Sequence, residues 1–188
     1  MTAKRARIYD LVALLVVIVI IALDQWTKTL VVNNLGPPEI GPTVRLIGDY
    51  LTLRYIQNSG AAFGLFADNI ALIGLIVIAV GVVAYLYLRM LNSGSLMYKI
   101  VFGMIIGGAL GNLIDRARHS GYVVDFIFFR IPQIGFNFYI FNIADACISV
   151  GIVLFLVLLI FGSWHSKREA ASEQNSGAEQ QATPSAKK

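Results

Sequence analysis

The sequence is poor in charge, cysteine and histidine, and each shortage excludes a class of site. Only 14% of its 188 residues are charged, and it has one cysteine (Cys147) and two histidines (His119 and His165). A single cysteine excludes an intrachain disulfide bond and says nothing of the redox compartment. Without an HExxH motif or a cluster of cysteine and histidine, we do not expect a zinc site. The net charge of +4, with no glycine-rich phosphate loop, calls for no nucleic-acid partner.

Apolar residues dominate the rest of the chain. Hydrophobic residues make up 57% of it and the mean hydropathy is +0.71, whereas a soluble domain of this size needs far more polar surface. A bilayer core of roughly 30 Å is crossed by about 20 helical residues. Four apolar runs approach or reach that length. We therefore predict an all-α membrane protein with four transmembrane helices, at residues 8–32, 69–90, 98–116 and 141–164.

The first apolar run follows the basic residues "KRAR", as the apolar part of a cleaved signal peptide would. However, this run is longer than a typical signal-peptide h-region, and it continues into "LDQWTK" instead of a small-residue cleavage site. We therefore interpret it as a retained helix.

The segment between the first two runs has a different pattern. It opens with glycine and proline and then nearly alternates in "TVRLIG" and "YLTLRYI", which is typical of strands. We predict a small extracytoplasmic β-region at 38–58, and a loop at 119–140 before the last helix. Residues 1–167 then form a single membrane domain. Residues 168–188 lack periodic apolar positions and are predicted to be a disordered tail.

Lysine and arginine residues orient the predicted helices. An even number of spans puts both termini on one side, and the more basic side is expected to be cytoplasmic. The side of the termini carries Lys4, Arg5, Arg7, Arg89, Lys99, Lys167 and Arg168. The opposite side is also basic, with Lys28, Arg45, Arg54, Arg116, Arg118 and Arg130, but several of these lie beside acids. We predict that both termini are cytoplasmic.

Polar residues in or beside the apolar runs gather toward the outward ends of the helices, where lipid makes each of them costly. They are Asp24, Lys28, Asn58, Asn112, Asp115, Arg116, Asp125, Asn142 and Asp145. Helical spacing allows ordinary ion pairs between Asp24 and Lys28, and between Asp115 and Arg116 or Arg118.

Asp125 and Asp145 are harder to explain by simple pairing. Neither has a basic residue at helical spacing on its own segment, and Arg130 lies five positions beyond Asp125. Asn142, close to Asp145, suits the N-cap of the last helix. Roughly 20 residues separate the two acids and connect the third predicted helix to the fourth. A connection of this length can bring Asp125 and Asp145 close together in space.

Two carboxylates in one low-dielectric site share a proton, so that one is charged and the other neutral near neutral pH. The charged member can take a proton from water while the neutral member donates to a carbonyl oxygen, as in an aspartic peptidase.

The residues leave other chemistries open. Asp115, Asp125 and Asp145 could hold a divalent cation, since hard cations prefer oxygen ligands, and Lys28 could activate Ser59 as a nucleophile. A proton-coupled transporter or channel would need polar residues through the whole membrane thickness, but "VALLVVIVIIA" and "IVLFLVLLIF" are unbroken. A non-catalytic scaffold leaves the unpaired acids unexplained.

Five segments, taken together, resemble one family. They are "DQWTK" (24–28), "NSGAAFG" (58–64), "GNLIDR" (111–116), "VVDF" (123–126) and "FNIAD" (141–145). Each segment is weak by itself. In this order, on a four-span frame and over nearly the whole chain except its termini, they are similar to lipoprotein signal peptidase, also called signal peptidase II.

The resemblance implies an aspartic endopeptidase that removes the signal peptide from diacylglyceryl-modified prolipoproteins by cutting before the lipidated cysteine. It implies that Asp125 and Asp145 are the catalytic pair, with no metal or other cofactor. The substrate-orienting residues would be Asn58, Asn112, Arg116 and Asn142. The supporting residues would be Asp24, Lys28 and Asp115.

The resemblance also implies where the protein works and what it meets. We expect a multi-pass monomer in the bacterial cytoplasmic (inner) membrane, surrounded by membrane lipids, with its active site near the outer leaflet. The β-region would cradle the substrate. Globomycin-type cyclic peptides would inhibit the enzyme.

Overall fold

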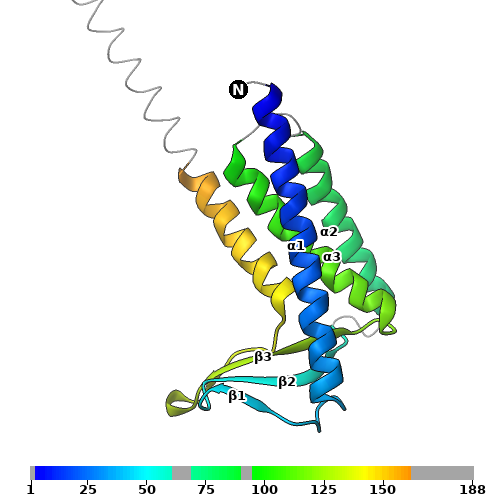
Figure 1. The fold of residues 1–188 in the computed structure, drawn as a ribbon, viewed down its shortest axis with the longest axis vertical. Coiled ribbons are helices and arrows are strands. Elements are labelled where there is room, and N and C mark those ends of the chain that lie inside the picture. The colour runs from blue at the N-terminus through cyan, green and yellow to red at the C-terminus, as the bar shows by residue number, and fades with distance from the viewer. Residues whose placement is uncertain (1–2, 61–68, 90–94, 162–188) are drawn as a thin grey trace, which may run out of the picture. The chain divides into compact units, whose positions relative to one another are not determined.

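The computed structural model describes residues 3–60, 69–89 and 95–161 (Figure 1). The chain divides into two compact units, Met1–Ile152 and Val153–Lys188, and the fold and site described below belong to the first. In the second unit, the described residues 153–161 are helical. The end of the "NSGAAFG" motif, His165 and the predicted tail lie outside the described residues.

The described residues form four long helices: α1 (Ala3–Leu35), α2 (Asn69–Arg89), α3 (Leu96–Arg118) and a last helix at Ile143–Phe161. Within these residues, three helices, α1, α3 and the last one, are long and apolar enough to cross a membrane. This confirms the membrane character of the chain, while the count of four spans stays a prediction.

Helix α1 begins five residues before the predicted span and ends three residues after it, at Ala3 and Leu35. Its first turns are polar, and Arg5 Nε donates to the Tyr9 hydroxyl, one turn later, at 2.7 Å. The helical hydrogen bonds thus continue beyond the apolar run. The length of an apolar run predicts the membrane-spanning part of a helix, and the helix itself can be longer.

Four antiparallel strands form one sheet in the order β1-β2-β3-β4: β1 (Val44–Ile47), β2 (Leu51–Asn58), β3 (Val123–Ile131) and β4 (Phe136–Asn137). Strands β1 and β2 confirm the β-region predicted after the first helix. The prediction of a loop at 119–140 is wrong for most of its length, because β3, a short 3₁₀ helix (Pro132–Ile134) and β4 occupy it. The first four residues of β3 are all buried. The strand therefore lacks the alternation of apolar and polar residues that indicates a half-exposed strand.

A small apolar core fixes β3 against the end of α1. Its buried members are Val31, Leu35, Tyr55, Val124 and Phe126. In Figure 1 the sheet lies at the end of α1 that is opposite the N-terminus. The register of β2 and β3 pairs Ile56 with Asp125 and Asn58 with Val123, after a shift that follows Leu53.

Glycines on α3 allow two helices to approach its backbone closely. A Cβ atom on Gly111 would lie 2.7 Å from Asp24 Oδ2 of α1. A Cβ on Gly108 would lie 2.5 Å from the carbonyl oxygen of Ala144, in the last helix. Close helix approach through small residues is typical of membrane interiors.

The count of charges along the sequence treats Lys99 as an exposed cation, but the structure shows that it is buried. Its side chain is fully buried, and its ammonium group pairs with Asp10. The Tyr87 hydroxyl also donates to Asp10, at 3.2 Å, so this cluster joins α1, α2 and α3. Lys99 is therefore part of a buried ion cluster and not of the exposed basic surface on this side.

Candidate active site

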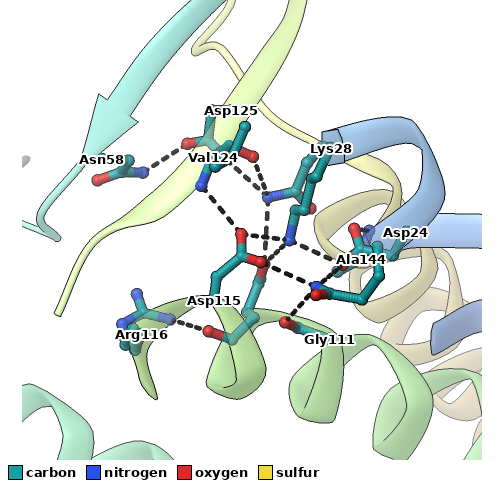
Figure 2. A network of polar contacts seen from close by, with 12 residues as sticks. Asp24, Lys28, Asn58, Gly111, Asp115, Arg116, Val124, Asp125 and Ala144 are labelled. Carbon is teal, nitrogen blue, oxygen red and sulfur yellow. Dashed lines mark hydrogen bonds and ion pairs between the residues drawn. The ribbon is translucent and has the colours of Figure 1, made fainter. Parts of the chain in front are cut away.

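The turn after β2 orients the side chain of Asn58. Gly60 has φ 80°, in the left-handed region that glycine enters at little cost, and its N–H donates to Asn58 Oδ1 at 2.8 Å. The amide nitrogen of Asn58 is then directed at the neighbouring strand, where it donates to Asp125 Oδ2 at 2.7 Å (Figure 2).

The N-terminus of the last helix forms a reciprocal cap. The Asp145 N–H donates to Asn142 Oδ1 at 2.9 Å, and the Asn142 N–H donates to Asp145 Oδ2 at 3.2 Å. Three-residue spacing between the cap and its partner is that of a capping box. The cap explains why "FNIAD" starts a helix here, and it fixes the carboxylate of Asp145.

Asn142 also links the two acids. Its amide nitrogen donates to Asp125 Oδ1 at 2.7 Å, so Asp125 and Asp145 bind opposite ends of one side chain. Asp125 is only 1% exposed. Burial, and in second place the charge of Asp145, raise the pKa of Asp125 to about 7, although hydrogen bonds from Asn58 and Asn142 oppose the shift.

A second path of polar contacts reaches Asp145 from α1 and α3. The Asn112 amide nitrogen donates to Asp145 Oδ1 at 2.7 Å, and Lys28 Nζ donates to Asn112 Oδ1 at 3.0 Å. The lysine thus polarises the amide that holds Asp145.

Lys28 is the centre of a buried ion cluster. Its ammonium nitrogen lies 2.8 Å from Asp24 Oδ2 and 2.9 Å from Asp115 Oδ2, and Figure 2 shows it between the two acids. The remaining oxygen of Asp24 accepts the Ala144 N–H at 3.0 Å, and Asp115 accepts the Val124 N–H at 3.0 Å. The cluster therefore holds the backbone immediately before both Asp145 and Asp125.

The sequence-predicted pairs around Asp115 are only partly right. The Asp24–Lys28 pair is confirmed, but Asp115 forms its ion pair with Lys28 and not with Arg116 or Arg118. Arg116 Nη1 donates to the Asn112 carbonyl oxygen at 3.3 Å. Its Nε atom is buried and finds no hydrogen-bond acceptor among the described residues. All nine predicted site residues belong to this one network.

Gln25 is a member of the network that the sequence analysis did not single out. Its amide nitrogen donates to Asp115 Oδ1 at 2.8 Å and to the Gly111 carbonyl oxygen at 3.2 Å. Its carbonyl oxygen accepts from Arg118 Nη1 at 3.1 Å. An amide inside an apolar helix, next to Asp24, was the available signal.

The geometry bears on the alternatives to an acid pair. Over residues 3–60, 69–89 and 95–161, no three His, Cys, Asp or Glu side chains are grouped to hold a metal ion. Asp115, one proposed ligand, is turned to Lys28. Lys28 itself contacts two acids and Asn112, so its ammonium group is not directed at Ser59, which is exposed.

A cavity of about 460 Å³ opens beside Asp125. Polar residues of β2 and aromatic residues of β3 and the segment after β4 line it, among them Arg54, Asn58, Asp125, Phe128, Phe138 and Tyr139. A buried acid with a raised pKa in the wall of a cavity lined by both aromatic and polar residues is a typical setting for general acid–base chemistry.

Comparisons with known proteins agree on one family. The model of the family described as signal peptidase (SPase) II matches residues 16–161. The lipoprotein signal peptidase of Mesorhizobium japonicum is 47% identical over 142 residues, which cover 74% of this chain and 80% of the relative. That of Bacillus subtilis is 36% identical over 162 residues, covering 86% and 99%.

The fold gives the same answer. A bacterial membrane enzyme, solved by the in meso method at 1.9 Å resolution, superposes with a TM-score of 0.68 at 28% sequence identity, covering 79% of this chain and 92% of that one. Because the family model matches most of the chain and the curated relatives exceed 30% identity over most of their own length, the chain belongs to the signal peptidase II family.

Proposed function

We propose that this chain is a membrane peptidase that removes the signal peptide from diacylglyceryl-modified prolipoproteins, cutting before the lipidated cysteine. Relatives of 35–47% identity are named lipoprotein signal peptidases. The observation that carries the proposal is the bridge through Asn142, which links Asp145 to Asp125 in the wall of a cavity. Within the part of the chain that the structure describes, the buried carboxylate of Asp125 accepts from two amides and forms no ion pair. A scaffold or a structural ion pair does not explain such an acid.

In this proposal Asp125 and Asp145 are the catalytic residues and share one proton. Asp125 carries the proton, because burial and the charge of Asp145 raise its pKa to about 7. Asp145 takes a proton from a water molecule, whose oxygen then attacks the carbonyl carbon of the scissile bond. Asp125 donates its proton to the carbonyl oxygen, which gives a neutral tetrahedral intermediate without a charged oxygen.

The other residues of the network position this pair and the substrate. Asn58 and Asn142 donate to Asp125, and Asn112 donates to Asp145. Arg116 has a buried N–H without an acceptor among the described residues, so it can receive a substrate carbonyl oxygen. The ion cluster of Asp24, Lys28 and Asp115 supports the backbone next to each acid.

The proposal includes a location and partners. The chain spans the bacterial inner membrane four times, with both termini in the cytoplasm. Its site lies near the outer leaflet, where a diacylated substrate keeps its lipid tails in the bilayer and its scissile bond at the interface. It acts as a monomer among membrane lipids, and globomycin-type cyclic peptides inhibit it by occupying the acid pair.

The test is cleavage of a diacylglyceryl-modified prolipoprotein by the purified protein in detergent. Asp125→Asn and Asp145→Asn should each lower kcat/KM by at least about 10³-fold, since neither asparagine can exchange a proton. Glu39→Gln is the matched control, because Glu39 is an exposed acid outside the network. It should cleave at the parent's rate.

Each variant is also checked for its thermal unfolding midpoint, so that misfolding is not mistaken for lost chemistry. A chelator is added to parallel samples of the parent. Near-parent activity in either aspartate variant, or a parent that stops cleaving in chelator, would refute the acid pair.

A further inference from the structure

A second cavity, of about 430 Å³, lies on the sheet next to the first. Its lining includes Arg45, Asp49, Thr52, Arg54, Phe128 and Arg130. Arg54 and Phe128 line both cavities. A polypeptide that leaves the candidate active site along β2 therefore passes directly into the second cavity.

The strand register places the lining residues on one face of the sheet. Thr52 of β2 pairs with Arg45 on one side and with Phe128 on the other, and directly opposed residues share a face. Arg130 lies two residues beyond Phe128, so strand alternation puts it on that face too. Arg54 lies at the register shift after Leu53, and its contact with the Phe128 ring places it on the same face. Three arginines from three strands thus converge on one cavity.

The cavity has more positive charge than its own acid neutralises. Asp49 Oδ1 lies 3.5 Å from Arg45 Nε and 3.4 Å from Arg130 Nη2, and the Asp49 side chain is 50% exposed. Pairs this long and this exposed are weak and easily exchanged for another anion. One carboxylate against three arginines leaves a net charge of +2 in the lining, if every group is ionised.

Arg54 is the arginine of this lining that forms no ion pair with an acid among the described residues. Its guanidinium carbon lies 4.5 Å from the centre of the Phe128 ring, and its Nε is buried with no hydrogen-bond acceptor among the described residues. A buried N–H without an acceptor is unfavourable. The planar guanidinium group, held flat on a ring, matches a carboxylate better than any neutral partner.

The continuity of the two cavities identifies the source of the anion, and this step rests on the proposed function. The occupant of the first cavity is then the prolipoprotein. Its signal-peptide part is apolar and lies in the membrane, so an acid must come from the mature part that follows the scissile bond. Asn58 contacts Asp125. Arg54 and Thr52 lie four and six residues before Asn58 on β2, which corresponds to about 13–20 Å along the strand at 3.3 Å per residue.

We propose that the second cavity binds acidic side chains of the substrate's mature segment, about four to six residues after the scissile bond. The enzyme then prefers prolipoproteins that carry aspartate or glutamate there. The preference adds to recognition of the lipidated cysteine and does not replace it.

The experiment compares two diacylglyceryl-modified prolipoproteins that differ only in having Asp or Asn at positions four to six after the scissile bond. We expect the parent to show a kcat/KM about two- to tenfold higher for the acidic one. This ratio should shrink in 1 M salt, which shortens the Debye length to about 3 Å.

Four variants test the residues. Arg54→Gln, and the double change Arg45→Gln with Arg130→Gln, should lower the ratio toward one. Asp49→Asn should raise it, because it frees Arg45 and Arg130; an effect of opposite sign is not expected from misfolding. Arg5→Gln, in the first turns of α1, is the matched control and should leave the ratio unchanged.

A binding measurement separates this inference from the proposed function. The dissociation constant of each substrate is measured with the Asp125→Asn variant. If the parent cleaves neither substrate but this variant binds the acidic one more tightly, the proposed function fails and the inference stands. Equal affinities and equal kcat/KM values for the two substrates overturn the inference alone. It is also overturned if the arginine variants keep the ratio and lose only binding to anionic phospholipid vesicles, since the cavity then holds a lipid headgroup.

Discussion

Asn142 accepts a backbone hydrogen bond from Asp145 and donates to Asp125 with the same amide group. A carboxamide can do both at once, because one end only accepts and the other only donates. Aspartate at this position would bring a third carboxylate beside the two acids, and alanine would remove the cap as well as the bridge. The helix start and the candidate chemistry therefore depend on one side chain.

The raised pKa of Asp125 predicts how activity depends on pH. A carboxyl group with a pKa of about 7 is protonated below pH 7 and loses its proton as the pH rises above it. If Asp125 donates that proton to the substrate, kcat/KM must fall on the alkaline side, approaching roughly tenfold for each pH unit. The measurement is kcat/KM of the parent between pH 6 and pH 9.

The exposed acid Glu39 again supplies a control, since Glu39→Gln should give the same profile as the parent. The thermal unfolding midpoint at each pH separates loss of chemistry from loss of structure. A kcat/KM that stays constant to pH 9 in a folded protein would show that Asp125 is not the proton donor.

Single residues could be predicted where their partners are close in the sequence. Asp24 and Lys28 are four apart in α1, and their ion pair is present. The same lysine also contacts Asn112 and Asp115, 84 and 87 positions further on. Helical spacing carries no information on such contacts, because they depend on how α1 and α3 pack. For this reason the pairing of Asp115 with its neighbouring arginines was predicted wrongly.

Among the elements, strand β3 shows what local pattern misses. Its partner, β2, comes 65 or more residues earlier in the chain. Its apolar residues run without alternation, since the first four are buried. Aromatic and β-branched residues in "VVDFIFFRI" fit a strand, but a short apolar run next to a helix does not by itself distinguish strand from loop or helix. The four long helices, by contrast, follow from apolar length alone.

The contact between α3 and the last helix gives a prediction at the scale of elements. Alanine at Gly108 would put a Cβ 2.5 Å from the Ala144 carbonyl oxygen and 2.8 Å from Ile148 Cγ1. The start of the last helix must then move, and Asp145 with it. Overpacking of this kind costs about 1–3 kcal/mol. If Asp145 is catalytic as proposed, its displacement lowers the rate about tenfold or more. The thermal midpoint and kcat/KM of Gly108→Ala should both fall.

Gly81 in α2 is the matched control for this change. A Cβ there meets no atom of the described residues within 4 Å, and alanine favours a helix over glycine by up to about 1 kcal/mol. Gly81→Ala should therefore keep its activity and unfold at the same temperature or slightly higher. If Gly108→Ala behaves like Gly81→Ala, the close approach at Gly108 does not position the last helix.

At the scale of the whole molecule, the buried pair of Asp10 and Lys99 changes how the charges are weighed. Lys99 is buried against its partner, so the exposed lysine and arginine residues near the helix ends carry the positive-inside argument. Lys4, Arg5 and Arg7 at the start of α1 still favour a cytoplasmic N-terminus. The sheet, beyond the other end of α1, would then face outward.

This orientation can be tested with single cysteines. Cys147 is the only natural one, so Cys147→Ala provides a background for Thr43→Cys, exposed just before β1, and Lys4→Cys, exposed in α1. In spheroplasts, a membrane-impermeant maleimide should label Thr43→Cys directly and Lys4→Cys only after permeabilisation. A cysteine appended after Lys188 should behave like Lys4→Cys, because the four proposed spans would return the chain to the cytoplasm. Direct labelling of the appended cysteine alone would indicate an odd number of spans, and direct labelling of Lys4→Cys would reverse the orientation.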